Sequence, residues 1–418
     1  MLKLLRSSGE FRRLFLAHTV SRAGDAFNTV ALVVLVFELT GSGRGVAGAV
    51  MFEVLPVLLL GPVAGLAADR VPRRTLMVGA DLFRAAVALA LVASASSVAM
   101  AYAVAFGLSA GAVVFNPAAT SLLPEVVGDD DVVDANSTMW TAAVTVQIAL
   151  APVAGFVIAA FGVEIAFLVN AATFIVSALL LLGLRAGRAA AETTERRWSG
   201  VLAGVRTVRA SPLLTRLAIV QVLASMAVGA TSGLLVVLAD RWLGVGPGGF
   251  GILLAAIGVG AAAGPLLLRR FIGAGDKRWL FGPFAVRGGV DLTLAAVANP
   301  VVAGGALAVY GMSTSTGMVA YQTTLQTLVP AETRGRAFAF YDVLWNAARL
   351  LSLALGGVLV DIIDVRFVYV ISAGLLLAAA TVGLTTNLEP TAVKTSGIES
   401  DRHDATARAM RRQRHRDS

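Results

Sequence analysis

The sequence predicts an all-α membrane protein with twelve transmembrane helices in two six-helix pseudo-symmetric halves. Three observations lead to this prediction. Hydrophobic residues make up 57% of the 418 residues and charged residues only 14%, whereas soluble domains carry roughly 25% charged residues. Apolar segments of about 20 residues, the length that crosses a bilayer, recur along the chain. The second half of the chain also weakly repeats the first.

The apolar segments are joined by short polar links, and the mean hydropathy of the chain is +0.79. We expect spans at residues 14–36, 46–67, 75–97, 99–121, 137–160, 164–184, 214–238, 249–270, 279–298, 300–322, 337–360 and 366–386. The first span carries charged residues and lacks a small-residue cleavage site, so we expect it to remain in the mature protein.

The longest internal link follows the sixth span and divides the chain. We expect an N-terminal six-helix half at 1–184, a cytoplasmic amphipathic linker at 185–213, a C-terminal six-helix half at 214–388 and a disordered basic cytoplasmic tail at 389–418. In the linker, apolar residues recur at helical spacing between arginines, a pattern typical of a helix lying on the inner leaflet. These apolar residues are Trp198, Val201, Leu202, Val205 and Val208.

The repeat between the halves rests on three correspondences. Pro124 with its following glutamate returns as Pro330 and Glu332 after 206 residues, and Arg84 of the third span corresponds to Arg287 of the ninth after 203. The segment 161–167 aligns with 363–369 after 202 residues. Such a repeat indicates two structurally related halves.

Basic residues are distributed by side of the membrane. The odd-numbered links hold only Arg44, Arg241 and Arg366, whereas the amino end, the even-numbered links and the tail hold 27 of the 34 Lys and Arg residues. The positive-inside rule then places both termini in the cytoplasm. The charge is not gathered on a soluble module, so we expect no nucleic-acid partner. The chain has no cysteine, which excludes disulfides and thiolate metal sites, and its three scattered histidines predict no metal site.

The stretch GLAADRVPRR between the second and third spans carries one carboxylate and three arginines in ten residues. It resembles the loop G-x-L-A-D-R-x-G-R-R between helices 2 and 3 of the major facilitator superfamily. The residues that match are Gly65, Asp69, Arg70, Arg73 and Arg74, and the departures are Ala67 and Pro72. In that superfamily the loop is a cytoplasmic latch, so the resemblance implies a solute transporter with its site between the two halves.

Further segments are similar to the drug:proton antiporter 3 group of this superfamily, which includes macrolide and tetracycline efflux proteins and the enterobactin exporter. They are WSGVLAGVRTVRASPLLTRL from Trp198, FNPAATSLLPEVV from Phe115 and the ANS at 135–137. In span five, ALAPVAG from Ala149 resembles the antiporter signature G-P-x-x-G-G, matched at Pro152 and Gly155. The resemblance covers about residues 10–386 and implies antiport.

Polar side chains inside the spans are candidates for proton coupling, because intramembrane charges are costly and commonly functional. Asp25 lies near the bilayer midplane on a polar stripe with Arg22, and we assign it the proton-coupling role. A permanent ion pair of Asp25 with Arg22 or Arg349 remains the alternative. Glu53 is a second proton site, an anionic contact for a cationic drug, or a neutral hydrogen-bonded acid. Arg349 is a partner for Asp25 or for an anionic group of the substrate. The alternative is that Arg349 only ties the two halves together structurally.

The latch has a direct physical account. The fold brings the amino end of span eleven close to Asp69, where a carboxylate interacts favourably with the helix dipole. We expect the basic residues of the loop, Asp81 and Arg84 of span three, and Asp342 of span eleven to complete a charge network that closes the cytoplasmic side. The alternative is that the arginines only set topology.

The superfamily lines its cavity with helices 1, 4, 7 and 10, and aromatic, hydroxyl and amide side chains suit amphipathic drugs. For each of these residues, helix packing remains the alternative reading. The cavity candidates are Asn28, Phe106, Ser109, Asn116, Gln147, Tyr310, Thr314, Tyr321 and Gln322.

The sequence thus predicts a secondary active transporter of the bacterial cytoplasmic membrane that exports amphipathic drug-like molecules in exchange for protons by alternating access. We expect a monomer in contact with membrane lipid, driven by the proton gradient, with no cofactor and no enzymatic activity. Lysophospholipid flipping, siderophore or natural-product export and nutrient uptake are the alternatives. An intramembrane prenyl-transfer enzyme is a remote alternative, raised by the D-D-x-x-D spacing of Asp130, Asp131 and Asp134.

Overall fold

The computed structural model describes residues 5, 8–93, 97–128, 131–185, 205, 208–209, 211–268, 277–328 and 331–386. Within these, side chains are described outside positions 62–63, 65–69, 133, 265–268, 319, 322–328 and 331–339. The tail at 389–418 and most of the linker expected at 185–213, with its amphipathic helix, lie outside the described residues.

Twelve helices of 20 to 32 residues make up most of the described part of the chain, and each overlaps one of the expected spans. The first six are α2 Gly9–Thr40, α3 Gly43–Arg70, α4 Arg73–Val92, α5 Val98–Val127, α6 Val132–Phe161 and α7 Val163–Leu182. The other six are α9 Pro212–Gly233, α11 Pro247–Leu268, α12 Lys277–Ala296, α13 Pro300–Leu328, α14 Ala331–Ile362 and α15 Val365–Leu384. A short helix, α10 Leu235–Val237, and a π-helical turn, η2 Leu238–Trp242, follow α9.

Ten of these helices are long and apolar enough, by length and composition, to cross a membrane. The two others, α12 and α13, are interrupted by polar residues, among them Arg287 and Asp291 in α12. Large apolar side chains cover the outer surface; Phe156 is 72% exposed and Val301 83% exposed. In water such a surface would be unfavourable, whereas lipid tails solvate it. The chain is therefore a multi-pass membrane protein.

Local sequence sets the helix ends. Ser8 and Ser211 accept a hydrogen bond from the backbone N–H three residues later at the starts of α2 and α9, and Pro212 occupies the first turn of α9. Both are favourable at helix starts. Gly41 ends α2 with φ of 56°, a backbone conformation in which glycine is favoured.

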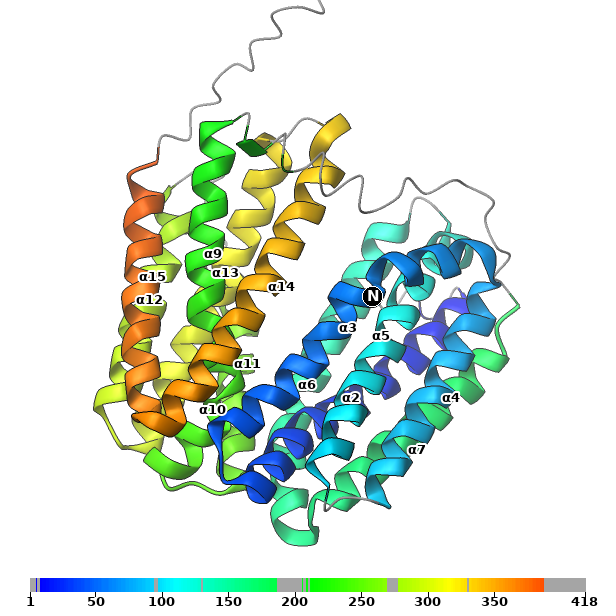
Figure 1. Cartoon of the computed structure of the whole chain (residues 1–418). Coiled ribbons are helices and arrows are strands. Elements are labelled where there is room, and N and C mark those ends of the chain that lie inside the picture. Colours follow the sequence, from blue (N-terminus) through cyan, green and yellow to red (C-terminus); the bar gives the residue numbers. More distant parts are fainter. Residues whose placement is uncertain are drawn as a thin grey trace, which may run out of the picture.

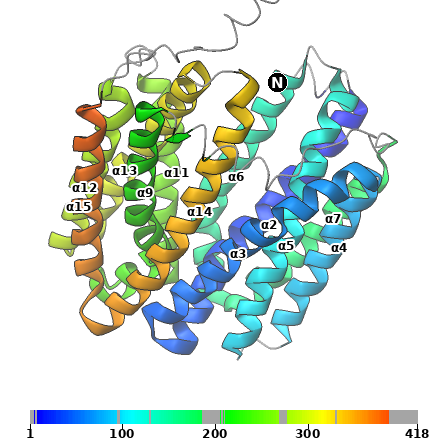
Figure 2. The same cartoon turned by 45° about the horizontal axis from the view of Figure 1, so that its top comes forward.

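The helices form two bundles, α2–α7 and α9–α15, that converge at one end of the molecule and diverge at the other (Figures 1 and 2). We call these the closed end, which carries the α2–α3 and α14–α15 links, and the open end, where α2 and α9 begin. Helices α3 and α14, and α6 and α11, make the main contacts between the bundles.

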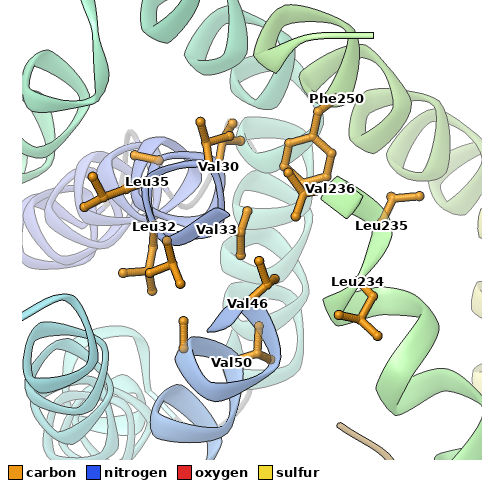
Figure 3. Close-up of a cluster of buried hydrophobic side chains, with 14 of the residues drawn as sticks. Val30, Leu32, Val33, Leu35, Val46, Val50, Leu234, Leu235, Val236 and Phe250 are labelled. Carbon is orange, nitrogen blue, oxygen red and sulfur yellow. The ribbon is translucent and has the colours of Figure 1, made fainter. Parts of the chain in front are cut away.

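Hydrophobic packing follows the same division. At the closed end a single buried cluster includes side chains of both halves, such as Val33 and Val50 from one and Leu234, Val236 and Phe250 from the other (Figure 3). Toward the open end each half has its own cluster, one around Phe115 and one around Phe281. The described core thus joins the halves at the closed end and keeps them separate toward the open end.

Candidate functional site

The first charged cluster lies midway along α2 and α4. The Asp25 carboxylate lies 3.8 Å from the Arg22 guanidinium and 4.0 Å from that of Arg84. Arg84 also bonds to Asp81, one turn earlier on α4. The side chain of Asp25 is 29% exposed, whereas that of Asp81 is fully buried. Of the two carboxylates, only Asp25 can exchange a proton directly with water entering between the helices.

Arg84 is held in place by aromatic rings as well as by Asp81. Its guanidinium carbon lies 4.9 Å from the ring centre of Phe115 and 4.2 Å from that of Phe174, distances at which a cation is attracted to a ring face. The backbone of Gly111 packs directly against the aliphatic part of Arg84. A rigid cation therefore faces Asp25 from within the N-terminal half.

The cluster extends to the other half through Glu53 on α3. Glu53 is partly buried and interacts electrostatically with Asp25 and with Arg349 of α14. His18 lies one turn before Arg22 on α2, toward the open end. It is near Arg22 and Arg84, and its ring centre is 6.4 Å from that of Phe115. The structure thus brings together all four residues that the sequence singled out for proton coupling, from both halves of the molecule.

Among the described side chains, the expected latch residues bond in separate groups. Arg73 bonds to Glu125 on α5, and Arg74 donates to the backbone oxygen of Leu182 on α7, so both arginines bond within the N-terminal half. Arg70 is exposed at the end of α3. Gly65 and Asp69 lie on α3, but their side chains are outside the description.

The positions of Asp81 and Arg84 differ from the prediction, which placed both residues in the latch. They lie deeper along α4 and pair with each other and with Asp25, because a buried charge requires a partner within reach. Asp342 on α14 accepts from the side-chain amide of Asn346 at 3.5 Å. In this arrangement the open end has no continuous charge network among the described side chains.

The closed end carries an ionic contact that the sequence did not reveal. Asp361, at the end of α14, accepts hydrogen bonds from the Ser42 hydroxyl at 2.5 Å and from the backbone N–H groups of Gly43 at 2.7 Å and Arg44 at 3.0 Å. The Arg44 side chain adds a bond at 3.2 Å, and Arg241 lies 3.7 Å away. A carboxylate of one half therefore caps the first helical turn of the other.

The expected cavity residues are distributed over several environments. Asn28 is buried on α2, Asn116 is exposed on α5, and the side chain of Gln322 is outside the description. The others are partly buried: Phe106, Ser109, Gln147, Tyr310, Thr314 and Tyr321. The hydroxyl of Tyr310 accepts from Arg287 at 3.1 Å, so this tyrosine is engaged inside the C-terminal half.

A cavity of about 80 Å³ lies inside the C-terminal half rather than between the halves. Its residues come from every long helix of that half except α14, and they include Asp291. The lining residues are Thr231, Ser232, Leu235, Leu254, Ile257, Asp291, Leu294, Leu307, Tyr310 and Tyr369. The sequence could have indicated Asp291 as a candidate site residue, because Asp291 lies one helical turn after Arg287.

The chain matches a family model described as transmembrane secretion effector over residues 5–414. It is 27% identical over 399 residues to the uncharacterized MFS-type transporter YfiS of Bacillus subtilis, which covers 91% of this chain and 94% of YfiS. It is 30% identical over 370 residues to the multidrug efflux pump Tap of Mycolicibacterium fortuitum, covering 83% of this chain and 88% of Tap.

Solved structures share the fold at low sequence identity. The nucleoside transporter NupG matches with a TM-score of 0.75 at 13% identity, over 90% of this chain and 98% of NupG. A bacterial homologue of the iron transporter ferroportin in an inward-facing state matches with a TM-score of 0.74 at 17% identity, over 92% and 98% of the two chains. The expected fold class is confirmed, and the remote alternative of an intramembrane enzyme is excluded because the matching family and relatives are transporters.

Proposed function

The chain belongs to the major facilitator superfamily of membrane transporters, and from this we propose that it exports amphipathic small molecules in exchange for protons. The observation that carries the proposal is the cluster of Asp25, Arg84, Glu53 and Arg349, in which ionisable groups of both halves lie within electrostatic range of one another midway across the fold. The similarity to a relative named as a multidrug efflux pump supports drug-like molecules as the cargo class.

The exchange follows from the partners of Asp25. A protonated Asp25 is neutral, and Arg84 then keeps Asp81 as its ionic partner; a charged Asp25 attracts Arg84 and Arg22. Each protonation state therefore favours a different set of contacts around α2 and α4. Because Glu53 connects this cluster to Arg349 of the other half, a change of charge at Asp25 biases the position of one half against the other.

We propose that the closed end faces the outside and the open end the cytoplasm, in a bacterial plasma membrane. The asymmetry of basic residues supports this orientation, since α2 begins and α15 ends at the open end, where α3 ends in Arg70 and α4 starts at Arg73. The arrangement of the described helices then corresponds to a state accessible from the cytoplasm, in which a monomer would load cargo for export and release protons.

The test is transport driven by a pH gradient. Inverted membrane vesicles carrying the wild-type chain are given ethidium, a tetracycline or a macrolide, and uptake is followed after an inward-acidic gradient is imposed. We expect Asp25→Asn to abolish gradient-driven uptake, because the amide cannot carry the proton. The matched control is Asp134→Asn, the same change at an exposed position on α6, which should leave uptake intact.

Uptake that survives Asp25→Asn would contradict the proton-coupling role of Asp25. If none of the three compounds moves with the wild-type chain while a lysophospholipid or an iron–siderophore complex does, the cargo class is wrong and the corresponding alternative is supported.

A further inference from the structure

A second buried carboxylate lies in the C-terminal half, outside the cluster around Asp25. Asp291 on α12 is 1% exposed and lines the cavity of about 80 Å³ inside that half. Drug-sized cargo occupies sites of roughly 300 to 1,000 Å³, so this cavity is too small for such cargo. It has room for a few water molecules, and its hydroxyl groups and carboxylate give such water polar partners.

The hydroxyl of Ser372 on α15 reveals the protonation state that fits this geometry. Its oxygen lies 2.5 Å from a carboxylate oxygen of Asp291 and 3.2 Å from the backbone oxygen of Ala227 on α9. A serine hydroxyl has one hydrogen, and a carbonyl oxygen can only accept. Both hydrogen bonds are made at once when Ser372 donates to Ala227 and a protonated Asp291 donates to Ser372.

The cation nearest to Asp291 is turned away from it. Arg287, one turn earlier on α12, donates to the Tyr310 hydroxyl at 3.1 Å, and its guanidinium carbon lies 4.7 Å from the centre of the Tyr310 ring. Among the described residues, no Arg, Lys or His nitrogen lies within 4.0 Å of the Asp291 carboxylate. Burying a carboxylate without a direct counter-ion is costly, so the neutral acid is the form that this arrangement favours.

Apart from Arg287, the described groups that face Asp291 from the neighbouring helices are uncharged. Tyr310 of α13, Tyr369 of α15 and the hydroxyl-bearing Thr231 and Ser232 of α9 line the same cavity. Arg287 is the charged group that acts on Asp291 electrostatically. The charge of Asp291 therefore depends mainly on where the Arg287 side chain points.

Helix α9 is interrupted beside the cavity. It ends at Gly233, and the chain continues as α10 and the π-helical turn η2. The backbone oxygen of Thr231, near the interruption, accepts from the Tyr369 hydroxyl at 3.0 Å. Interrupted helices in transporters often line ion sites and move during the transport cycle, so this segment offers a way for water to reach Asp291.

We propose that Asp291 is a proton-binding site of the C-terminal half, occupied in the arrangement seen here. A proton from cavity water binds the carboxylate and leaves a neutral acid that donates to Ser372. When Arg287 swings from Tyr310 to the carboxylate, the ion pair replaces the O–H bond and the proton returns to water. The site extends the proposed antiport to a second carboxylate, but it requires neither a particular cargo nor Asp25.

The test is infrared difference spectroscopy of the full chain in lipid vesicles, without cargo. A protonated carboxyl group has a C=O stretching band that ionised carboxylates lack. We expect a band at neutral pH that Asp291→Asn removes and that Asp25→Asn, the matched control, retains. The proposal is overturned if Asp291→Asn leaves every such band in place.

A second variant tests the exchange with Arg287 even if Asp291→Asn does not fold. Tyr310→Phe removes the hydroxyl that holds Arg287 and leaves the guanidinium free to pair with Asp291. We expect that half-protonation of Asp291 then requires an about tenfold higher proton concentration, since a direct ion pair favours the charged carboxylate. An unchanged titration of the band in Tyr310→Phe would refute the role of Arg287. Because no transport is measured, a failed result here is distinct from a failure of drug export by the wild-type chain.

Discussion

Replacing Asp361 by Asn should release the closed end of the molecule. Asp361 joins α14 to the start of α3 through the Ser42 hydroxyl, the Gly43 and Arg44 backbone and the side chain of Arg44. Arg241 of its own half lies 3.7 Å from it. The amide keeps one acceptor oxygen but loses the charge. Both carboxylate oxygens accept bonds from the other half in the wild-type chain, so the substitution removes at least one of them.

The size of the effect follows from burial. The side chain of Asp361 is 10% exposed, whereas those of Arg44 and Arg241 are 60% and 36% exposed. A partly buried carboxylate at a helix N-terminus contributes up to about 2 kcal/mol, and the exposed pair with Arg44, which crosses between the halves, adds about 0.5 kcal/mol. The total of about 2 to 2.5 kcal/mol predicts a roughly 30- to 70-fold shift of the equilibrium toward the state that is open at this end.

Spin-label distances measure this shift directly. The chain contains no cysteine, so label pairs can be introduced without background: Leu39 with Ile363 at the closed end, and Arg12 with Arg216 at the open end. In Asp361→Asn we expect a longer distance to gain population at the closed end and a shorter one at the open end.

The matched control for this measurement is Asp364→Asn. Asp364 is an acid at the same end of the molecule, but its side chain caps α15 within its own half by accepting from the Arg366 backbone at 2.7 Å. The reasoning is refuted if Asp361→Asn leaves both distance distributions unchanged, or if Asp364→Asn shifts them equally.

Three further changes test other contacts. Asp69→Asn should slow the switch between states and leave cargo affinity largely intact; a normal transport rate with altered affinity would contradict the latch. Gly111→Ala should displace the side chain of Arg84, against which Gly111 packs, and reduce proton coupling without loss of membrane insertion, measured as gradient-driven uptake per molecule. Gly251→Val should weaken the contact of α11 with α6, because a Cβ at this position would lie 2.6 Å from the backbone oxygen of Ala151. A loss of about 1 to 3 kcal/mol should lower the thermal unfolding temperature, and an unchanged temperature would argue against a tight contact there.

The twelve long helices could be predicted from the sequence because a chain in lipid must satisfy its backbone hydrogen bonds within each apolar segment. The predicted ends of the helices were less accurate. Helix α2 extends over Gly9–Thr40, beyond the expected 14–36, since it continues through polar residues to Ser8 and Gly41, which satisfy its terminal groups. Hydropathy detects the apolar core of a span and not the caps that end it.

Contacts within the site could be predicted only between residues that are close together in the sequence. Arg22 and Asp25 lie one turn apart on α2, so their pairing follows from helical geometry. The approach of Arg84 to Asp25 depends on how α2 and α4 both pack against α5 and α7, and the bond between Arg44 and Asp361 joins residues 317 positions apart. A single sequence carries no periodic signal for such contacts. For the same reason the sequence assigned Arg84 to the latch, although packing places it beside Asp25.

The two halves share a polar arrangement but differ in what it can do. In each, the third long helix, α4 or α12, carries an arginine with an aspartate one turn away. That aspartate faces a serine of the last helix, Ser177 or Ser372. In the N-terminal half Arg84 neutralises Asp81 directly, which leaves Asp25 as the exchangeable carboxylate.

In the C-terminal half α9 contains no acidic residue, and Arg287 bonds to Tyr310 instead of Asp291. The exchangeable carboxylate of that half is then Asp291 itself. Asp25 is 29% exposed and meets water whenever the open end is accessible, whereas Asp291 is buried and meets water only through its cavity. Proton exchange at Asp25 should therefore follow the opening of the halves, and exchange at Asp291 should follow the slower movement of the interrupted α9 segment and Arg287.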